Sequence, residues 1–262
     1  MTFLNIVIPV CSFHRTCIQQ CVKSINEQTR IPDKIILVLN EYEKYKSEYD
    51  TIISNNSQCT FIKINTWEKP GINRNIGSNQ CSDGIILYQD VDDIMHPQRC
   101  ELVEKCFDKY NCDLLLHESV QDYAYSPQPE IFILNLTDDA IILPNDVMYK
   151  LDKTLDFINY IPINFAKYFG EINNKNKHSN ITNGNCCVKT KILEANKDIW
   201  SDYHEAEDIK FVNDVTRKYK NTLILMMPLI IVVGRDHIRL IDKKVCHKKN
   251  HKVIDYDPVL KK

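Results

Sequence analysis

The chain has 262 residues, a formal net charge of −2, and contents of 44% hydrophobic and 26% charged residues. These values are ordinary for a globular protein, and the length suits one large α/β domain. Because the charge is nearly balanced, no global basic field attracts nucleic acid, and an anionic substrate has to be held by a local group of side chains. We therefore expect a globular protein with no nucleic-acid partner.

The apolar segments are short. The longest, Leu223 to Val233, contains Pro228 and is well below the roughly 20 residues of a membrane-spanning helix. The apolar run at residues 4–10 is too short for a signal peptide, and no small-residue cleavage site follows it. The sequence therefore predicts a cytoplasmic protein without a transmembrane segment.

Eleven cysteines are scattered along the chain without a CxxC pair or the spacing of a zinc site. In a cytoplasmic protein this pattern indicates reduced, mostly buried thiols that pack as small apolar groups.

Strand and helix patterns alternate in the first half. Apolar, β-branched runs predict strands within residues 4–10, 31–41, 59–65, 85–88 and 111–120. Helical spacing of apolar residues predicts helices within residues 16–29, 42–54, 72–80 and 97–110. This alternation is typical of an α/β fold with a mostly parallel central sheet flanked by helices.

Three carboxylates, Asp90, Asp92 and Asp93, follow the run Ile85 to Tyr88 directly. Ligands of open parallel sheets bind outside the carboxyl ends of the strands, so these side chains are placed for chemistry. Hard oxygen ligands of this kind suit Mn²⁺ or Mg²⁺. The alternative is an acidic turn in which Asp93 caps a helix that has Pro97 in its first turn.

Arg74 and Asn75 lie on the short helix that precedes this strand. The planar guanidinium of an arginine placed there can reach a diphosphate, although an exposed helical arginine is the alternative.

These motifs resemble, in order and spacing, the nucleotide-binding half of family 2 glycosyltransferases with the GT-A fold. The residues that carry the resemblance are IVIPV with the following HR, the βαβ unit ending at Asn40-Glu41, GINRNIG, and DVDD. The resemblance implies that Asp90 contacts the ribose or the metal, that Asp92 binds Mn²⁺ or Mg²⁺, and that Asp93 supports the site. It also implies a nucleotide-sugar pocket, lined by Pro9, Val10, Arg15, Asn40, Glu41, Arg74, Asn75 and Asp90.

One departure from the family pattern concerns the base. The family usually ends its second strand with a D-D-x-S-like sequence that contacts uracil, and this chain has Asn40-Glu41-Tyr42 there. UDP is the expected nucleotide, but the base is left open at this point.

The expectations for the second half of the chain rest mainly on the same resemblance. Strand-like runs occur at 131–136 and 140–144, and residues 171–180 form a polar loop or a lid. The strand from Thr182 to Val188 resembles the one that faces acceptor and donor sugar, which makes Asn183, Gly184 and Asn185 the expected acceptor contacts.

Acidic residues gather again at the start of a later helix. Glu207 and Asp208 resemble the family's acidic pair, and inverting sugar transfer needs a carboxylate that takes the proton of the acceptor hydroxyl. Asp208 is the expected base, Glu207 the second choice and Glu205 the third. The alternative is that the helix macrodipole alone favours acidic residues in its first turn.

His237 follows the last apolar run and resembles a third metal ligand, since imidazole suits Mn²⁺. The alternative is a solvated loop histidine, with Arg235 and Arg239 contacting phosphate. We expect one GT-A domain with a nucleotide-sugar half at 1–110 and an acceptor and catalytic half at 111–240. The basic extension at 241–262 is expected to form a closing loop and short extension, or to make a weak contact with a membrane surface or with the acceptor.

The expected function is metal-dependent, inverting transfer of a sugar from a UDP-sugar to a hydroxyl of a glycan or glycoconjugate. A sugar nucleotidyltransferase is the alternative enzyme, and the lack of glycine in CSFHR argues against its phosphate loop. A noncatalytic domain that binds nucleotide sugars or glycans is the alternative outside enzymes. Donor sugar, linkage and oligomeric state are not specified by these motifs.

Overall fold

A computed structural model describes residues 2–122, 141–144, 180–196, 198–200, 202, 207–219 and 221–233. The strands are β1 (Leu4–Val10), β2 (Lys34–Leu39), β3 (Thr60–Lys63), β4 (Ile85–Tyr88), β5 (Asp93–Met95), β6 (Leu114–Asp122), β7 (Ile141–Pro144), β8 (Asn180–Lys189) and β9 (Asn221–Val233). The α-helices are α1 (Ile18–Asn26), α2 (Lys46–Asn55), α3 (Pro70–Ser78), α4 (Arg99–Tyr110), α7 (Thr190–Glu194) and α8 (Glu207–Lys218). Two 3-10 helices, η1 (Ser12–Cys17) and η2 (Tyr42–Tyr45), precede α1 and α2.

The strands form one sheet in the order β3-β2-β1-β4-β8-β6-β9-β5, with β7 also paired to β9. Strands β3, β2, β1 and β4 are parallel, as are β6 and β9. β8 runs antiparallel to both β4 and β6. From β1 the chain continues outward to β2 and β3 and then returns to β4 on the other side of β1. Such a reversal of strand order opens a crevice at the carboxyl ends of the two strands, here β1 and β4.

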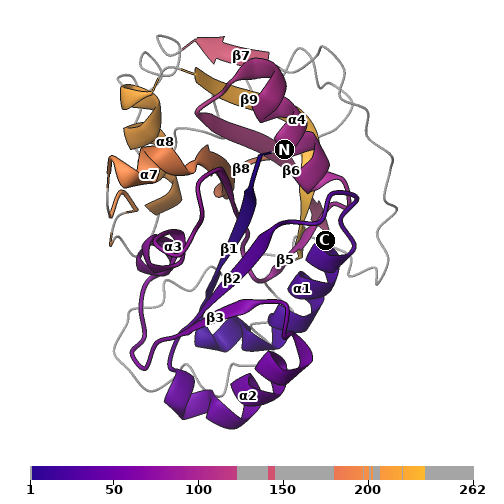
Figure 1. Ribbon diagram of the computed structural model, residues 1–262, viewed down its shortest axis with the longest axis vertical. Helices are drawn as coiled ribbons and strands as arrows, with labels where there is room; N and C mark the ends of the chain where they lie inside the picture. The colour runs from indigo at the N-terminus through magenta and orange to yellow at the C-terminus, as the bar shows by residue number, and fades with distance from the viewer. Residues whose placement is uncertain are drawn as a thin grey trace, which may run out of the picture.

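Helices cover both faces of the sheet (Figure 1). One face packs apolar side chains of α1 and α4 against alternate residues of the central strands, such as Ile8 and Leu87. The other face packs α3, α7 and α8 against residues of opposite parity, such as Val7 and Ile86. Because each central strand is buried on both faces, its sequence is a continuous apolar run.

The expected α/β fold with flanking helices is confirmed. The acidic-cap alternative is wrong, because Asp93 begins β5 and Gln98 occupies the position before α4. None of the helices in the described ranges combines the length and the hydrophobicity needed to cross a bilayer. The expected strand at 131–136, residues 171–179 of the expected loop, Glu205, His237 and the extension at 241–262 lie outside the described residues. Asn180, expected as the last residue of that loop, instead begins β8.

Candidate active site

Arg74 lies at the centre of a buried group of charged side chains. Its NH2 atom is 2.7 Å from Asp90 Oδ1, and its NH1 atom is 2.7 Å from Glu207 Oε1. The side chains are 3% (Arg74), 28% (Asp90) and 12% (Glu207) exposed. They come from α3, from the residues after β4 and from the first turn of α8, so three segments of the chain meet at the carboxyl end of β4.

The close packing of α3 on the sheet sets the position of Arg74. Pro70 begins the helix, where its missing N–H costs nothing. Gly77 lies so close to β1 that a Cβ atom there would be 2.5 Å from Val7 Cγ1. The glycine therefore lets the helix approach the sheet, which directs Arg74 to the end of β4.

Trp200 packs against the guanidinium of Arg74, whose Cζ atom is 4.5 Å from the centroid of the indole ring. Asn75 fixes this tryptophan in place. Its Nδ2 donates to the Trp200 carbonyl (2.9 Å), and its Oδ1 accepts from the Trp200 N–H (3.1 Å). The expected nucleotide-sugar contact of Asn75 stays a prediction, and the contact that the structure shows is this link to Trp200.

The charge balance of the group favours protonated Arg74. Burial works against the charged guanidinium, but the carboxylates of Asp90 and Glu207 more than offset this effect and hold the pKa of Arg74 above its ordinary value. One cation between two carboxylates leaves the group with a net negative charge, which favours hydroxyl or cation ligands over a bare anion.

Gly184 of β8 lies against this ion pair. A Cβ atom at this position would be 2.8 Å from Asp90 Oδ2 and 3.2 Å from Arg74 NH2. A residue larger than glycine would therefore displace the carboxylate or the guanidinium. The neighbouring Asn183 lies in β8 as well, and its side chain is outside the described part of the structure.

Asn185, the next residue of β8, binds the acidic turn that follows β4. Its Oδ1 accepts from the Asp90 N–H (2.7 Å), and its Nδ2 donates to Asp93 Oδ2 (2.9 Å). The residue is 1% exposed. Its expected contact with an acceptor stays a prediction, whereas its role in holding the turn is visible.

Asp92 points toward the loop after β1. Its Oδ2 atom is 3.9 Å from His14 Nε2, and the two side chains are 11% and 22% exposed. Carboxylate oxygens and an imidazole have the donor chemistry that suits Mn²⁺. Over the described ranges, three or more His, Cys, Asp or Glu side chains do not gather as a ready cation site. One or two carboxylates nevertheless suffice where substrate phosphates complete the coordination.

The expected nucleotide pocket begins at the carboxyl ends of β1 and β2. Pro9 and Val10 are buried in β1. Arg15 donates from Nε to Glu48 Oε2 (2.6 Å) and stacks on Tyr45 at 4.2 Å. The Arg15 side chain is 16% exposed and that of Glu48 is 51% exposed. The expected contact of Arg15 with the nucleotide stays a prediction.

Asn40 and Glu41 close the end of β2. Asn40 is fully buried and donates from Nδ2 to the Glu68 carbonyl (2.6 Å). Glu41 adopts a left-handed backbone with a φ of 52° and accepts a hydrogen bond from the Ser12 hydroxyl. The carboxylate of Glu41 thus contacts the segment that follows β1, beyond the carboxyl ends of β1 and β2.

Asp208 is the second residue of α8 and is partly exposed, whereas Glu207 beside it is bound to Arg74. The sequence predicted Arg74, Asp90 and Glu207 as separate site residues, but it did not predict that Arg74 forms ion pairs with both carboxylates. It gave no role to Trp200, and it included His14 in the HR motif without predicting its contact with Asp92. A tryptophan just before the acidic pair and a histidine in the first loop were the available signals.

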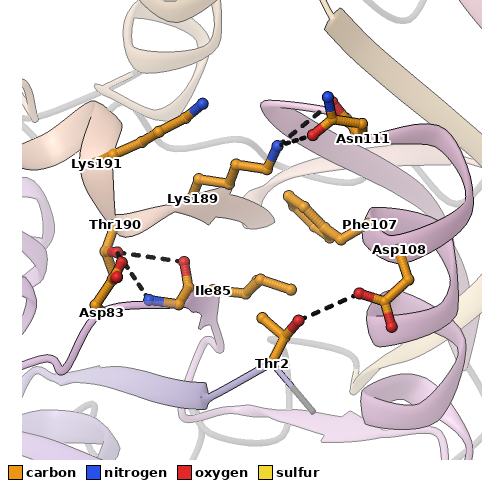
Figure 2. Close-up of a pocket in the computed structure, with 10 residues that line it drawn as sticks. Thr2, Asp83, Ile85, Phe107, Asp108, Asn111, Lys189, Thr190 and Lys191 are labelled. Atoms are coloured by element: carbon orange, nitrogen blue, oxygen red, sulfur yellow. Dashed lines mark hydrogen bonds between the residues drawn. The ribbon is translucent and has the colours of Figure 1, made fainter.

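A cavity of about 450 Å³ lies at the opposite end of β4, lined by residues that include Gly84 and Ile85. Figure 2 shows this cavity in close-up, with Ile85 and its neighbours labelled. Its polar groups are already paired: Lys189 donates to Asn111, and the Thr190 hydroxyl donates to Asp83. A second cavity of about 360 Å³ lies beside Asn75 and Trp200. Neither cavity is lined by Arg74, Asp90 or Glu207, but the second is lined by Asn75 and by Trp200, which packs against Arg74.

Residues 5–124 match the protein family described as Glycosyl transferase family 2. The resemblance to the family 2 glycosyltransferases is confirmed. The match spans β1 to the end of β6 and therefore includes Arg74, Asp90 and Asp92. A comparison with curated proteins gives no significant match.

Crystal structures of S. aureus TarS share the fold. TarS 1-349 in complex with UDP has a TM-score of 0.61 at 14% identity, and the match covers 95% of this chain and 67% of that chain. For TarS 1-349 in complex with UDP-GlcNAc, the TM-score is 0.57 at 13% identity, with 89% and 59% covered. For the TarS crystal structure the TM-score is 0.55 at 14% identity, with 95% and 40% covered. These matches confirm the GT-A fold, and together with the family they support a glycosyltransferase.

Proposed function

We propose that the protein transfers a sugar from a UDP-sugar to a hydroxyl of a glycan or glycoconjugate, with inversion at the sugar carbon. The observation that carries the proposal is the contact of Arg74 with both Asp90 and Glu207 at the carboxyl end of β4. The choice of UDP is supported by the UDP and UDP-GlcNAc complexes of TarS, a protein of the same fold.

The Arg74 group fits the sugar part of the donor. Sugar hydroxyls donate hydrogen bonds to carboxylates and accept them from a guanidinium, so an Asp–Arg–Glu row offers complementary partners for adjacent hydroxyls. Because Arg74 is bound on both sides, its main work is to hold Asp90 and Glu207 in fixed orientations before the donor arrives. Such preorganisation lowers the entropic cost of binding and reaction.

The diphosphate part of the donor belongs beside Asp90 and Asp92, with Mn²⁺ or Mg²⁺ as the proposed cofactor. Asp92, together with Asp90 and, by resemblance, His237, would hold the ion. When bound, such an ion stabilises the charge that develops on the leaving diphosphate. His14 adjoins Asp92 and would orient its carboxylate.

Asp208 is the proposed general base. Its carboxylate would take the proton of the acceptor hydroxyl while the hydroxyl oxygen bonds to the sugar carbon. The bond from that carbon to the phosphate oxygen breaks, and its electron pair leaves with UDP. Glu207 is less suited to this step, because Arg74 already binds its carboxylate.

A nucleotide screen tests the proposal. The full chain is heated with UDP, GDP, CDP or ADP, each with Mn²⁺ or with a chelator, and the unfolding temperature is measured. A ligand that binds only the folded protein raises this temperature by an amount set by its concentration relative to Kd. We expect UDP with Mn²⁺ to give the largest shift. A protein that responds to no nucleoside diphosphate would contradict the proposal, and a response independent of Mn²⁺ would remove the metal from it.

Release of UDP from UDP-sugars in the presence of candidate glycans then tests transfer. Net retention of configuration at the sugar carbon of the product would refute the inverting mechanism. Formation of a UDP-sugar from UTP and a sugar phosphate would instead establish the nucleotidyltransferase alternative.

A further inference from the structure

We infer that Arg99 is a positioning residue for the donor site, acting through Gln89 and Asn185 on the turn from Asp90 to Asp93. The inference rests on the proposed function, because it assigns this turn to donor binding. Arg99 is the first residue of α4, and its buried side chain contacts Gln89 and Asn185, the two residues that bind the turn.

Arg99 is fully buried and makes four polar contacts within 3.0 Å. Its NH1 donates to Gln89 Oε1 (3.0 Å), and its Nε donates to His117 Nε2 (3.0 Å). Its NH2 donates to the carbonyl oxygens of Tyr88 (2.9 Å) and Asn185 (2.6 Å). The guanidinium therefore joins β4, β6 and β8 at one point.

Gln89 links Arg99 to the backbone of the turn. With its Oε1 held by Arg99, its Nε2 donates to the carbonyl oxygens of Asp90 (2.9 Å) and Asp93 (3.1 Å). The turn itself is closed by a hydrogen bond from the Asp93 N–H to the Asp90 carbonyl (3.1 Å). The amide of Gln89 thus fixes both ends of the segment that carries Asp90 and Asp92.

Asn185 forms a second link between Arg99 and the turn. Arg99 holds its backbone carbonyl, while its side chain binds the Asp90 N–H and the Asp93 carboxylate. The same residue follows Gly184, which touches the Asp90 carboxylate. The two paths from Arg99 therefore meet on Asp90, whose carboxylate binds Arg74.

Lysine cannot replace this guanidinium. Arginine presents five N–H donors in a rigid planar fork, whereas an ammonium group is a single point with three donors on a flexible stem. With lysine, some of the four acceptors would lose their donor in a buried place, and each such loss is costly. The turn would then be held by fewer contacts and would sample positions in which Asp90 and Asp92 are misaligned.

A general role of Arg99 in stability is the competing explanation, and kinetics separate the two. Loss of stability alone lowers the fraction of folded enzyme, which reduces apparent kcat and leaves both KM values unchanged. Misplacement of the acidic turn raises the donor KM, because the proposed function places the donor diphosphate beside Asp90 and Asp92, whereas loss of folded enzyme alone does not change this KM.

The experiment measures the Kd of UDP with Mn²⁺, donor KM and acceptor KM, and the unfolding midpoint for the parent and three variants. Arg99→Lys removes part of the fork. Gln89→Glu keeps the acceptor for Arg99, and so retains that contact, but it removes the N–H donors to the turn. Val103→Ala, one turn along α4 in the same core, is the control for stability alone.

We expect Arg99→Lys and Gln89→Glu to weaken UDP binding and raise donor KM by about tenfold or more. Val103→Ala should keep the parent Kd and KM values while it lowers the midpoint. If Arg99→Lys does not fold, Gln89→Glu decides. Parent affinity in Gln89→Glu, or an equal loss of affinity in Val103→Ala, overturns the inference. A parent protein that binds no nucleoside diphosphate overturns the proposed function itself, and the inference with it.

Discussion

Arg74 NH1 and Glu207 Oε1 are 2.7 Å apart although the two residues are separated by 133 positions in the chain. This contact ties the start of α8 to α3, and the second contact of Arg74, with Asp90, ties both to the end of β4. The guanidinium of Arg74 therefore links Asp90, in the expected nucleotide-sugar half, to Glu207, in the expected catalytic half.

Replacement of Arg74 by Lys should lower both stability and donor affinity. The ammonium group can bind one of the two carboxylates but cannot span both, which leaves the other partly buried without its cation. Hydrogen bonds to charged groups contribute about 1.5 to 3 kcal/mol each, so we expect a loss of about 2 kcal/mol in the free energy of unfolding. Urea unfolding and UDP titration measure the two effects. Unchanged values for both would show that the bridge contributes nothing.

Removal of the Asp92 carboxylate should abolish the Mn²⁺ dependence of UDP binding and leave the fold intact. Asp92→Ala deletes a side chain at a strand end that contributes little to the core. Asp108→Ala is the matched control, because that carboxylate binds the Thr2 hydroxyl at the opposite end of the sheet. Calorimetric titration of UDP with and without Mn²⁺ gives the result. Equal Mn²⁺ dependence in both variants would exclude Asp92 as a ligand.

Asp208→Asn should lower kcat by about 10² to 10⁴, the usual contribution of a general base, with little change in UDP affinity. Glu207→Gln should instead raise donor KM, because it weakens the contact with Arg74 that orients the site. Steady-state kinetics with both substrates distinguish these outcomes. A fully active Asp208→Asn combined with an inactive Glu207→Gln would move the base by one residue.

An alanine at position 184 should disrupt the site from β8. Its Cβ would be 2.8 Å from Asp90 Oδ2, so the carboxylate has to leave Arg74 or β8 has to shift. Gly84→Ala is a control for strain, since Gly84 has a φ of 147° and lies far from the site at the start of β4. Both variants should be less stable, but only Gly184→Ala should lose UDP affinity per folded molecule. Similar affinity losses in the two would indicate a general folding defect.

Buried thiols should make the protein less stable at high pH. Burial raises the pKa of Cys11 to about 12, and that of Cys17 and Cys59 to about 11, from an ordinary value of 9.0. The folded protein then keeps thiol protons that the unfolded chain loses above pH 9, so this stabilisation is complete below pH 9 and declines as the pH rises toward 11. Urea midpoints at pH 8 and pH 10.5 measure the decline, and Cys17→Ser should reduce it. An identical decline in that variant would assign the effect to other groups.

The sequence by itself indicated the strands and helices of the first half and the position of the carboxylates after β4. Continuous apolar runs such as β1 and β4 are local signals, because a strand buried on both faces has to be apolar at every position. Because Asp90, Asp92 and Asp93 come directly after the apolar run of β4, predicting this strand also places the carboxylates at its carboxyl end. The order of the motifs from β1 to DVDD was sufficient to indicate the family.

Only the tertiary structure decided which side chains meet. The pairing of Arg74 with Glu207, 133 positions away, and the position of Gly184 against Asp90 depend on how the later segments pack beside β4, where β8 pairs antiparallel. No local periodicity encodes such distant partners. The contacts of Arg99 could not be predicted from the sequence either. In the sequence it is an ordinary cation at the start of a helix, and only the packing of α4 against the sheet buries it among four acceptors behind the acidic turn. Long-range burial, which sets the energetic value of each polar contact, is a property of the folded chain and not of any one segment.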